Sequence, residues 1–158
     1  MKKIQILSAS FKNGHNIPSR YTCDGKGISP HISWGEVPSG AASIALIMDD
    51  PDAPTGVFVH WVVYNIPADK RELPEAFLKK DKMNDGTCQG VSDFGRAGIG
   101  YWGPCPPHGI FHHYYFKVYV LDTKLDLAPQ ASKKQLEDAM NGHILAKGEM
   151  MGMYGRHG

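Results

Sequence analysis

The chain has 158 residues, of which 42% are hydrophobic and 21% are charged, as in ordinary globular proteins. This length fits a single domain, residues 1–158, which can bury a hydrophobic core without metal ions or disulfides. The 17 basic and 16 acidic residues are interspersed and leave a formal net charge of +1, so no basic face for nucleic acid is predicted. We therefore expect no nucleic-acid partner.

The sequence shows no targeting or membrane-spanning pattern. Its first residues lack the apolar run of a signal peptide, and no stretch approaches the roughly 18 apolar residues of an integral membrane segment. The cysteines Cys23, Cys88 and Cys105 form no Cys-x-x-Cys pair, which argues against a secreted disulfide scaffold and against structural zinc. We expect a cytoplasmic protein, and one disulfide beside one free thiol remains an open alternative.

Four segments are predicted to form strands. Residues 2–9 alternate weakly, whereas residues 41–48 form a continuous apolar run that is typical of a strand buried on both faces. Residues 57–66 are rich in β-branched and aromatic side chains. The longest candidate, residues 111–121, alternates between two faces and turns His113 away from the apolar one.

A helix is predicted where Ser132 and Gln135 form a capping box, because apolar residues then recur at helical spacing as far as Ile144. A second helical candidate covers residues 73–80. After the first helix, the sequence predicts only a short tail of glycines and methionines. Strands dominate and no alternation of strands with helices is present, so the predicted fold is a mainly β, antiparallel β-sandwich with few peripheral helices.

The segment of residues 84–109 has neither a strand period nor a helix period. Loops longer than about 12–15 residues are uncommon in compact domains and are usually functional. Phe94 and Trp102 are anchors that a free linker would not need, and prolines stiffen its end. We interpret the segment as an ordered loop that lines a site, with a long surface connection between edge strands as the alternative.

Polar side chains at the predicted strand ends indicate a site for a small anion. A carboxylate of Asp50 or Asp52 that accepts a hydrogen bond from His60 or His112 fixes the tautomer and favours the protonated imidazole. The Tyr114 hydroxyl and backbone N–H groups of the glycine-rich loop add donors suited to phosphate, sulfate or carboxylate. Taken singly, a histidine in a strand is more often structural, and Asp-Pro-Asp-Ala-Pro is more often a turn.

Two enzymatic functions are the alternatives. A metal-assisted hydrolase would use His60, His112 and either Asp50 or Asp52 as ligands. A thiol enzyme would use Cys105 as its nucleophile. The sequence contains no nucleophile elbow, P-loop or dinucleotide fingerprint, so a binding protein without metal, cofactor or catalytic residues is the leading interpretation.

The motifs form an ordered set that runs through most of the chain. They are Tyr21-Thr22-Cys23-Asp24-Gly25 with Ser29-Pro30, Trp34, Asp50-Pro51-Asp52-Ala53-Pro54, His60-Trp61, Asp93-Phe94-Gly95, Tyr101-Trp102-Gly103-Pro104-Cys105-Pro106-Pro107-His108-Gly109 and His112-His113-Tyr114-Tyr115-Phe116-Lys117-Val118-Tyr119. This set resembles the phosphatidylethanolamine-binding protein family, also called the Raf kinase inhibitor protein family, in its short bacterial and archaeal branch.

The resemblance implies a large antiparallel sheet packed on a smaller one, and a pocket for small anions, phosphorylated ligands and phospholipid head groups. It also implies a binding protein that modulates a kinase or protease without catalytic turnover, and homodimerisation. The ligand-binding residues that it implies are Asp50, Pro51, Asp52, His60, Gly103, Cys105, Pro106, His112 and Tyr114.

The sequence departs from the family pattern at three points. His113 stands where animal members have arginine, and the long C-terminal helix of the animal members is absent, which argues against kinase regulation of the animal type. Cys88 does not belong to the family pattern, and only packing or a bridge is predicted for it.

Overall fold

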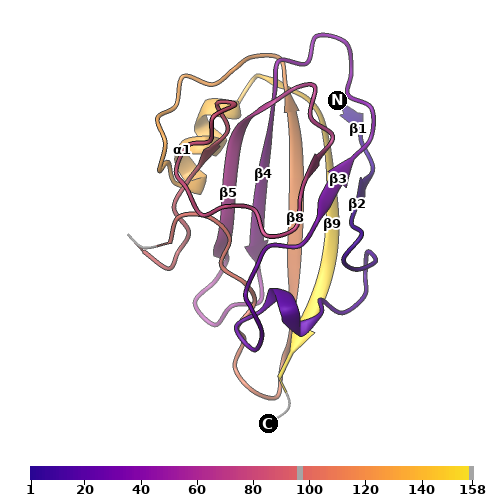
Figure 1. Ribbon diagram of the computed structural model, residues 1–158, viewed down its shortest axis with the longest axis vertical. Helices are drawn as coiled ribbons and strands as arrows, with labels where there is room; N and C mark the ends of the chain where they lie inside the picture. The colour runs from indigo at the N-terminus through magenta and orange to yellow at the C-terminus, as the bar shows by residue number, and fades with distance from the viewer. Residues whose placement is uncertain (96–97, 157–158) are drawn as a thin grey trace.

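The computed structural model describes residues 1–95 and 98–156, which form two β-sheets with one α-helix and a short 3-10 helix (Figure 1). The strands are β1 (Lys2–Lys3), β2 (Ile6–Leu7), β3 (Ile32–Trp34), β4 (Ser43–Asp50), β5 (Phe58–Pro67), β6 (Glu72–Leu73), β7 (Cys88–Gln89), β8 (Phe111–Leu121) and β9 (Ile144–Gly155), and the helices are η1 (Ser19–Tyr21) and α1 (Lys133–Met140). The larger sheet has the order β1-β9-β8-β4-β5-β7, and the smaller has the order β2-β3-β6.

The predicted fold class, an antiparallel sandwich of a large and a small sheet, is confirmed. Among the named strands, every pairing is antiparallel except that of β1 with β9. Strand β4 lies between β5 and β8 and is buried along its whole length, as its continuous apolar run predicts. One of its faces packs toward the small sheet through residues such as Leu46, and the other carries Ile47 toward α1.

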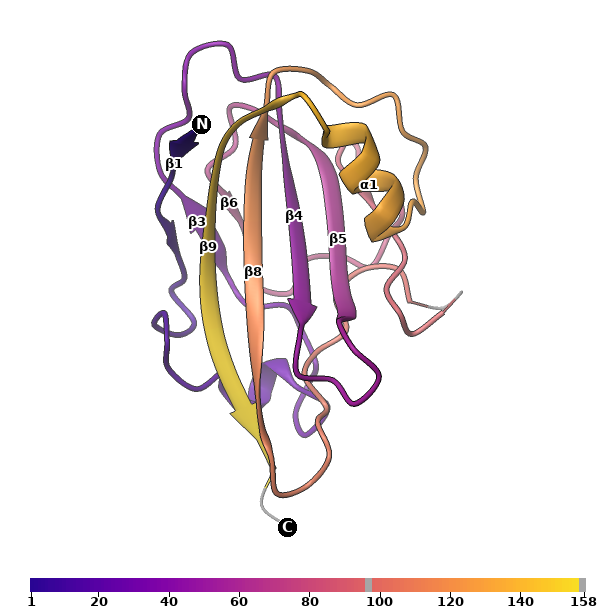
Figure 2. The same cartoon turned by 180° about the vertical axis from the view of Figure 1, so that it is seen from behind.

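Helix α1 begins at the predicted capping box. The Ser132 hydroxyl accepts from the Gln135 N–H, and the Gln135 side chain accepts from the Ser132 N–H. The helix ends at Met140 rather than continuing to Ile144, because Gly142 adopts a positive φ of 85° and the chain turns into β9. Seen from behind, α1 lies beside β5 (Figure 2). Within the described residues, no helix is long and apolar enough to cross a membrane.

The predicted N-terminal strand, residues 2–9, is instead two short strands in different sheets. Strand β1 pairs with β9, whereas β2 pairs with β3. The Lys2 and Lys3 side chains are exposed at the edge of the large sheet, but Ile6 is buried in the core between the sheets. The chain therefore crosses from one layer to the other within this segment, and a single alternation pattern cannot describe it.

The helix predicted for residues 73–80 is wrong. After β6 the chain makes a turn at residues 75–76, where Ala76 has a positive φ of 60°, which is incompatible with a right-handed helix. Two of its backbone N–H groups are taken by Ser29: Ala76 donates to the Ser29 carbonyl, and Phe77 donates to the Ser29 hydroxyl. These long-range bonds replace the ones that a helix would make.

The predicted short tail after α1 is also wrong, because it forms the 12-residue strand β9. This strand pairs along almost its whole length with β8. Its glycines lower the strand propensity of the segment, but close packing requires them. A Cβ atom at Gly148 would lie 2.0 Å from the Ile4 carbonyl oxygen, and one at Gly152 would lie 2.5 Å from Ile17. The glycines thus let the N-terminal segment lie directly against β9.

Candidate functional site

A cavity of about 240 Å³ lies at the end of the large sheet where β4 ends and β5 and β8 begin. The antiparallel order of these strands brings their polar ends together. The residues that line the cavity are Asp50, Ala53, Pro54, Phe58, His60, Phe94, Cys105, Pro106, Pro107, His112 and Tyr114. Six of the nine predicted ligand-binding residues are therefore brought together here.

The most buried polar pair of the cavity is His112 with Asp50. Each residue is only 3% exposed, and His112 Nδ1 lies 2.7 Å from Asp50 Oδ2. The other carboxylate oxygen, Oδ1, accepts from the Asp52 backbone N–H at 2.7 Å. Because a carboxylate only accepts, Nδ1 of His112 carries the hydrogen. Asp50 thus fixes both the orientation and the tautomer of His112, as one of the predicted pairings requires.

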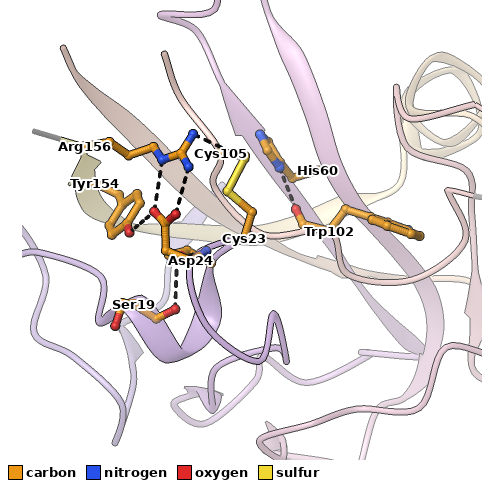
Figure 3. Close-up of a disulfide and its surroundings, with 9 residues drawn as sticks. Ser19, Cys23, Asp24, His60, Trp102, Cys105, Tyr154 and Arg156 are labelled. Atoms are coloured by element: carbon orange, nitrogen blue, oxygen red, sulfur yellow. Dashed lines mark hydrogen bonds and ion pairs between the residues drawn. A yellow bond between two sulfur atoms is a disulfide. The ribbon is translucent and has the colours of Figure 1, made fainter. Parts of the chain in front are cut away.

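His60 is held by the backbone rather than by a carboxylate. Its Nδ1 lies 2.6 Å from the Trp102 carbonyl oxygen (Figure 3). The Trp102 N–H in turn donates to the His60 carbonyl oxygen. The carbonyl only accepts, so Nδ1 of His60 also carries the hydrogen. Burial lowers the pKa of His60, although the Trp102 carbonyl and the Asp50 charge act in the opposite direction.

The remaining ring nitrogen of each histidine is available to a ligand. Within the described residues, the hydrogen bonds of both rings involve Nδ1, and no fully buried side-chain nitrogen or oxygen lacks a partner. The Nε2 atoms of His60 and His112 are therefore reached by solvent through the cavity. In the neutral rings Nε2 is an acceptor, so an anion requires a proton on each ring nitrogen that it contacts.

Tyr114 supplies a hydroxyl beside both rings. Its ring centroid lies 5.3 Å from that of His60, edge to face, and 6.4 Å from that of His112, nearly parallel. Burial raises the pKa of Tyr114, and the negative charges of Asp50 and Asp52 raise it further. A hydrogen bond to the Asp50 carboxylate contributes as well, so the hydroxyl stays protonated at physiological pH, and an anion would compete with Asp50 for its hydrogen.

The cavity also has an apolar side, whose residues were not among the predicted ligand-binding residues. Phe58 lies 5.0 Å from the His60 ring and 4.9 Å from Phe94 between centroids. Ala53, Pro54 and Pro107 complete this lining. Phe58 precedes His60 by two residues in the same strand, so the alternation of β5 places both on one face, which is a signal that sequence reading could have used.

The glycine-rich loop also lines the cavity, through Phe94, Cys105, Pro106 and Pro107. This agrees with its interpretation as an ordered loop that lines a site, although residues 96–97 of the loop lie outside the described residues. Cys105 forms a disulfide with Cys23. Cys88 is buried and free, so the alternative of one disulfide beside one free thiol is the observed one.

Three predicted residues lie outside the cavity lining. Pro51 contributes to a hollow on the opposite side of the sheet. The Asp52 carboxylate accepts from the backbone N–H and from Nδ1 of His113, not from His60 or His112. Gly103 packs against Tyr21, where a Cβ atom would lie 2.2 Å from the carbonyl oxygen. These residues shape the surroundings of the cavity, and the pairing of Asp52 with a site histidine is corrected.

The two enzymatic alternatives receive no support from this geometry. Among residues 1–95 and 98–156, no group of three or more His, Cys, Asp or Glu side chains is arranged to hold a metal ion. His60 turns its Nδ1 to a carbonyl, and His112 turns its Nδ1 to Asp50. The Cys105 sulfur is bonded to Cys23 and is not a free nucleophile.

A larger cavity, of about 530 Å³, lies on the opposite face of β8, and none of the predicted site residues lines it. Lys117 contributes to it but is ion-paired with the buried carboxylate of Asp49, which Lys133 of α1 also contacts. Glu149 adds a negative charge to the same lining. Lys3 and Lys147 also line this cavity, but both are exposed, so it lacks the buried donors with fixed orientations that surround His112.

Comparison with known proteins identifies the family to which this chain belongs. The family described as "Phosphatidylethanolamine-binding protein" matches residues 7–155. A UPF0098 protein of Aquifex aeolicus is 55% identical over 155 residues, which cover 97% of this chain and 89% of the relative. A UPF0098 protein of Methanothermobacter thermautotrophicus is 50% identical, covering 97% and 99% of the two chains.

A solved structure shares the whole fold. The crystal structure of a putative phosphatidylethanolamine-binding protein homologue, CT736 from Chlamydia trachomatis, superposes with a TM-score of 0.88 at 39% identity and covers 99% of each chain. The chain belongs to the phosphatidylethanolamine-binding protein family.

Proposed function

We propose that this protein binds a small oxyanion, as phosphate or as the phosphoryl group of a larger ligand, in the cavity around His112, and that it does not turn the ligand over. The observation that carries the proposal is that His60, His112 and Tyr114 line one cavity while each imidazole is held through its Nδ1, which leaves its Nε2 for a ligand. Each ring is held by its other nitrogen, so the anion meets a preorganised set of groups.

The apolar side of the cavity favours a phosphoryl group that carries an organic moiety. Phe58 and Phe94 face the same space as the two histidines. An ethanolamine phosphate head group fits this chemistry, and the name of the family supports it. A phosphorylated side chain of a kinase or protease would present the same group, and titration with a phosphoserine peptide distinguishes that source from a head group.

Isothermal titration tests the proposal. Wild-type protein is expected to bind inorganic phosphate and O-phosphorylethanolamine saturably, and His112→Asn is expected to bind at least about tenfold more weakly, because a charged hydrogen bond contributes about 1.5–3 kcal/mol. The asparagine amide can still donate to Asp50, so the buried carboxylate keeps a partner. His113→Asn is the matched control, since His113 is the neighbouring residue and pairs with Asp52 outside the cavity. Equal binding by the two variants would contradict the proposal.

Affinity for sulfate is expected to fall as the pH rises through about 6 to 8, the histidine range. Burial lowers the pKa of His60, so the free ring is neutral near neutral pH and must take up a proton when the anion binds. The affinity then changes by about tenfold per pH unit for each proton taken up. Sulfate keeps its charge over this range, so the dependence belongs to the protein. A flat profile would exclude the imidazoles and leave the backbone donors.

A further inference from the structure

The Cys23–Cys105 disulfide is part of the cavity wall. Cys105 lines the cavity, and the bond joins it to a segment 82 residues earlier in the chain, directly after η1 (Figure 3). Both cysteines are exposed. An exposed disulfide is open to attack by a thiolate, and such bonds are the labile or regulatory ones more often than buried bonds.

The part of the cavity wall that residues 104–107 form, called the Cys105 wall below, contains one backbone donor for an anion. Residues 104–107 are Pro-Cys-Pro-Pro, so Cys105 carries the only backbone N–H of the four. The Cys23 N–H donates to the Pro104 carbonyl oxygen at 3.1 Å, beside the disulfide. The covalent bond and this hydrogen bond together fix the position of the one backbone donor in the wall.

The segment that carries Cys23 also restrains the loop at Gly109, just after the Cys105 wall. The Asp24 carboxylate accepts from Nη2 and Nε of Arg156, at 2.9 and 3.1 Å, and from the Tyr154 hydroxyl (Figure 3). The Arg156 carbonyl oxygen in turn accepts from the Gly109 N–H at 2.6 Å. The loop therefore depends on residues 23–24 at both Cys105 and Gly109.

Reduction would change both the shape and the charge of this wall. A dithiol reductant attacks one cysteine sulfur as a thiolate and forms a mixed disulfide, and its second thiol then displaces the protein sulfur. Two electrons and two protons pass to the protein, which gains two thiols, and the reductant becomes a cyclic disulfide. The guanidinium of Arg156 lies 4.0 Å from Cys105 Sγ, so it favours the thiolate there. That thiolate would add a negative charge to the cavity lining and compete with Asp24 for Arg156.

We propose that the Cys23–Cys105 bond is a redox modification site that sets the anion affinity of the cavity: the disulfide form binds, and the dithiol form binds more weakly. This inference rests on the proposed anion-binding function. Its physical basis is the loss of a covalent restraint on the Cys105 N–H together with a new negative charge in the lining.

Titration of sulfate into oxidised protein and into protein reduced with dithiothreitol, which is uncharged, tests the inference. The reduced form is expected to bind about tenfold more weakly, as a unit charge placed close to a bound anion predicts. Thiol counting verifies the redox state, and circular dichroism verifies the fold. The double variant Cys23→Ser/Cys105→Ser, which lacks the bond but gains no charge, is expected to fall between the two forms. Cys88→Ala, at the buried free cysteine, is expected to respond to the reductant as the wild type does.

The outcomes separate the inference from the function on which it rests. Equal affinities of the oxidised and reduced forms would overturn the inference and leave the anion site intact. Tighter binding by the reduced form would reverse its sign and overturn it as well. If neither form binds sulfate, phosphate or O-phosphorylethanolamine, the proposed function fails and the inference fails with it.

Discussion

An Asp50→Asn variant is expected to take up about one proton fewer than the wild type when it binds sulfate, and to bind more tightly than the wild type at about pH 8. The reason lies in the two bonds of the Asp50 carboxylate. Oδ1 accepts from the Asp52 N–H, and Oδ2 accepts from Nδ1 of His112. An asparagine satisfies both neighbours only with its oxygen toward Asp52 and its amide toward His112.

That orientation reverses the tautomer of His112. The asparagine amide donates to Nδ1, so the neutral ring carries its hydrogen on Nε2 and can donate it to the anion without protonation. His60 keeps its requirement for a proton, because the Trp102 carbonyl still holds its Nδ1. The pH dependence of sulfate affinity should therefore become shallower by about one decade per pH unit.

Titrations in buffers of different ionisation enthalpy measure the proton uptake directly. Asp52→Asn is the matched control, because the Asp52 carboxylate accepts from Nδ1 of His113 and does not line the cavity. This control is expected to keep the wild-type proton uptake. An Asp50→Asn profile parallel to that of the wild type would show that Asp50 does not set the tautomer of His112.

The cavity also shows which parts of a site can be predicted from sequence. The alternation of residues 111–121 places His112 and Tyr114 on the buried face, and a carboxylate partner for His112 follows from the polar residues at the end of β4. The partner of His60 could not be predicted, because it is the backbone carbonyl of Trp102, 42 residues away, and every residue has such a carbonyl. Side-chain chemistry is visible in a sequence, whereas backbone acceptors depend on the fold.

Strand β9 and the disulfide show a related limit. The local sequence of β9, with its glycines and methionines, has little strand propensity, and its conformation comes from pairing with β8 and from close contact with the N-terminal segment. Three cysteines allow three pairings, and only the approach of residue 23 to residue 105 in the folded chain selects one. Both features depend on contacts between distant parts of the chain, which no local pattern contains.

Gly103→Ala is expected to lower the free energy of unfolding by about 2–4 kcal/mol. A Cβ atom at Gly103 would lie 2.2 Å from the Tyr21 carbonyl oxygen and 3.0 Å from the Thr22 Cα, so it would meet backbone rather than a flexible side chain. That carbonyl also accepts from the buried hydroxyl of Tyr101 at 2.6 Å, which restricts its movement. Urea denaturation of the oxidised protein measures the loss.

Gly35→Ala is the matched control, because a Cβ atom there would meet nothing within 4 Å. It is expected to change stability by less than about 1 kcal/mol in either direction.

Gly103 stands two residues before Cys105, so the displaced wall in Gly103→Ala should also weaken sulfate binding, although no atom of Gly103 lines the cavity. A Gly103→Ala protein as stable as the control would mean that the loop can move away from Tyr21. The close contact at Gly103 would then not hold Cys105 in place, which would leave that role to the disulfide and to the Cys23 N–H bond with the Pro104 carbonyl oxygen.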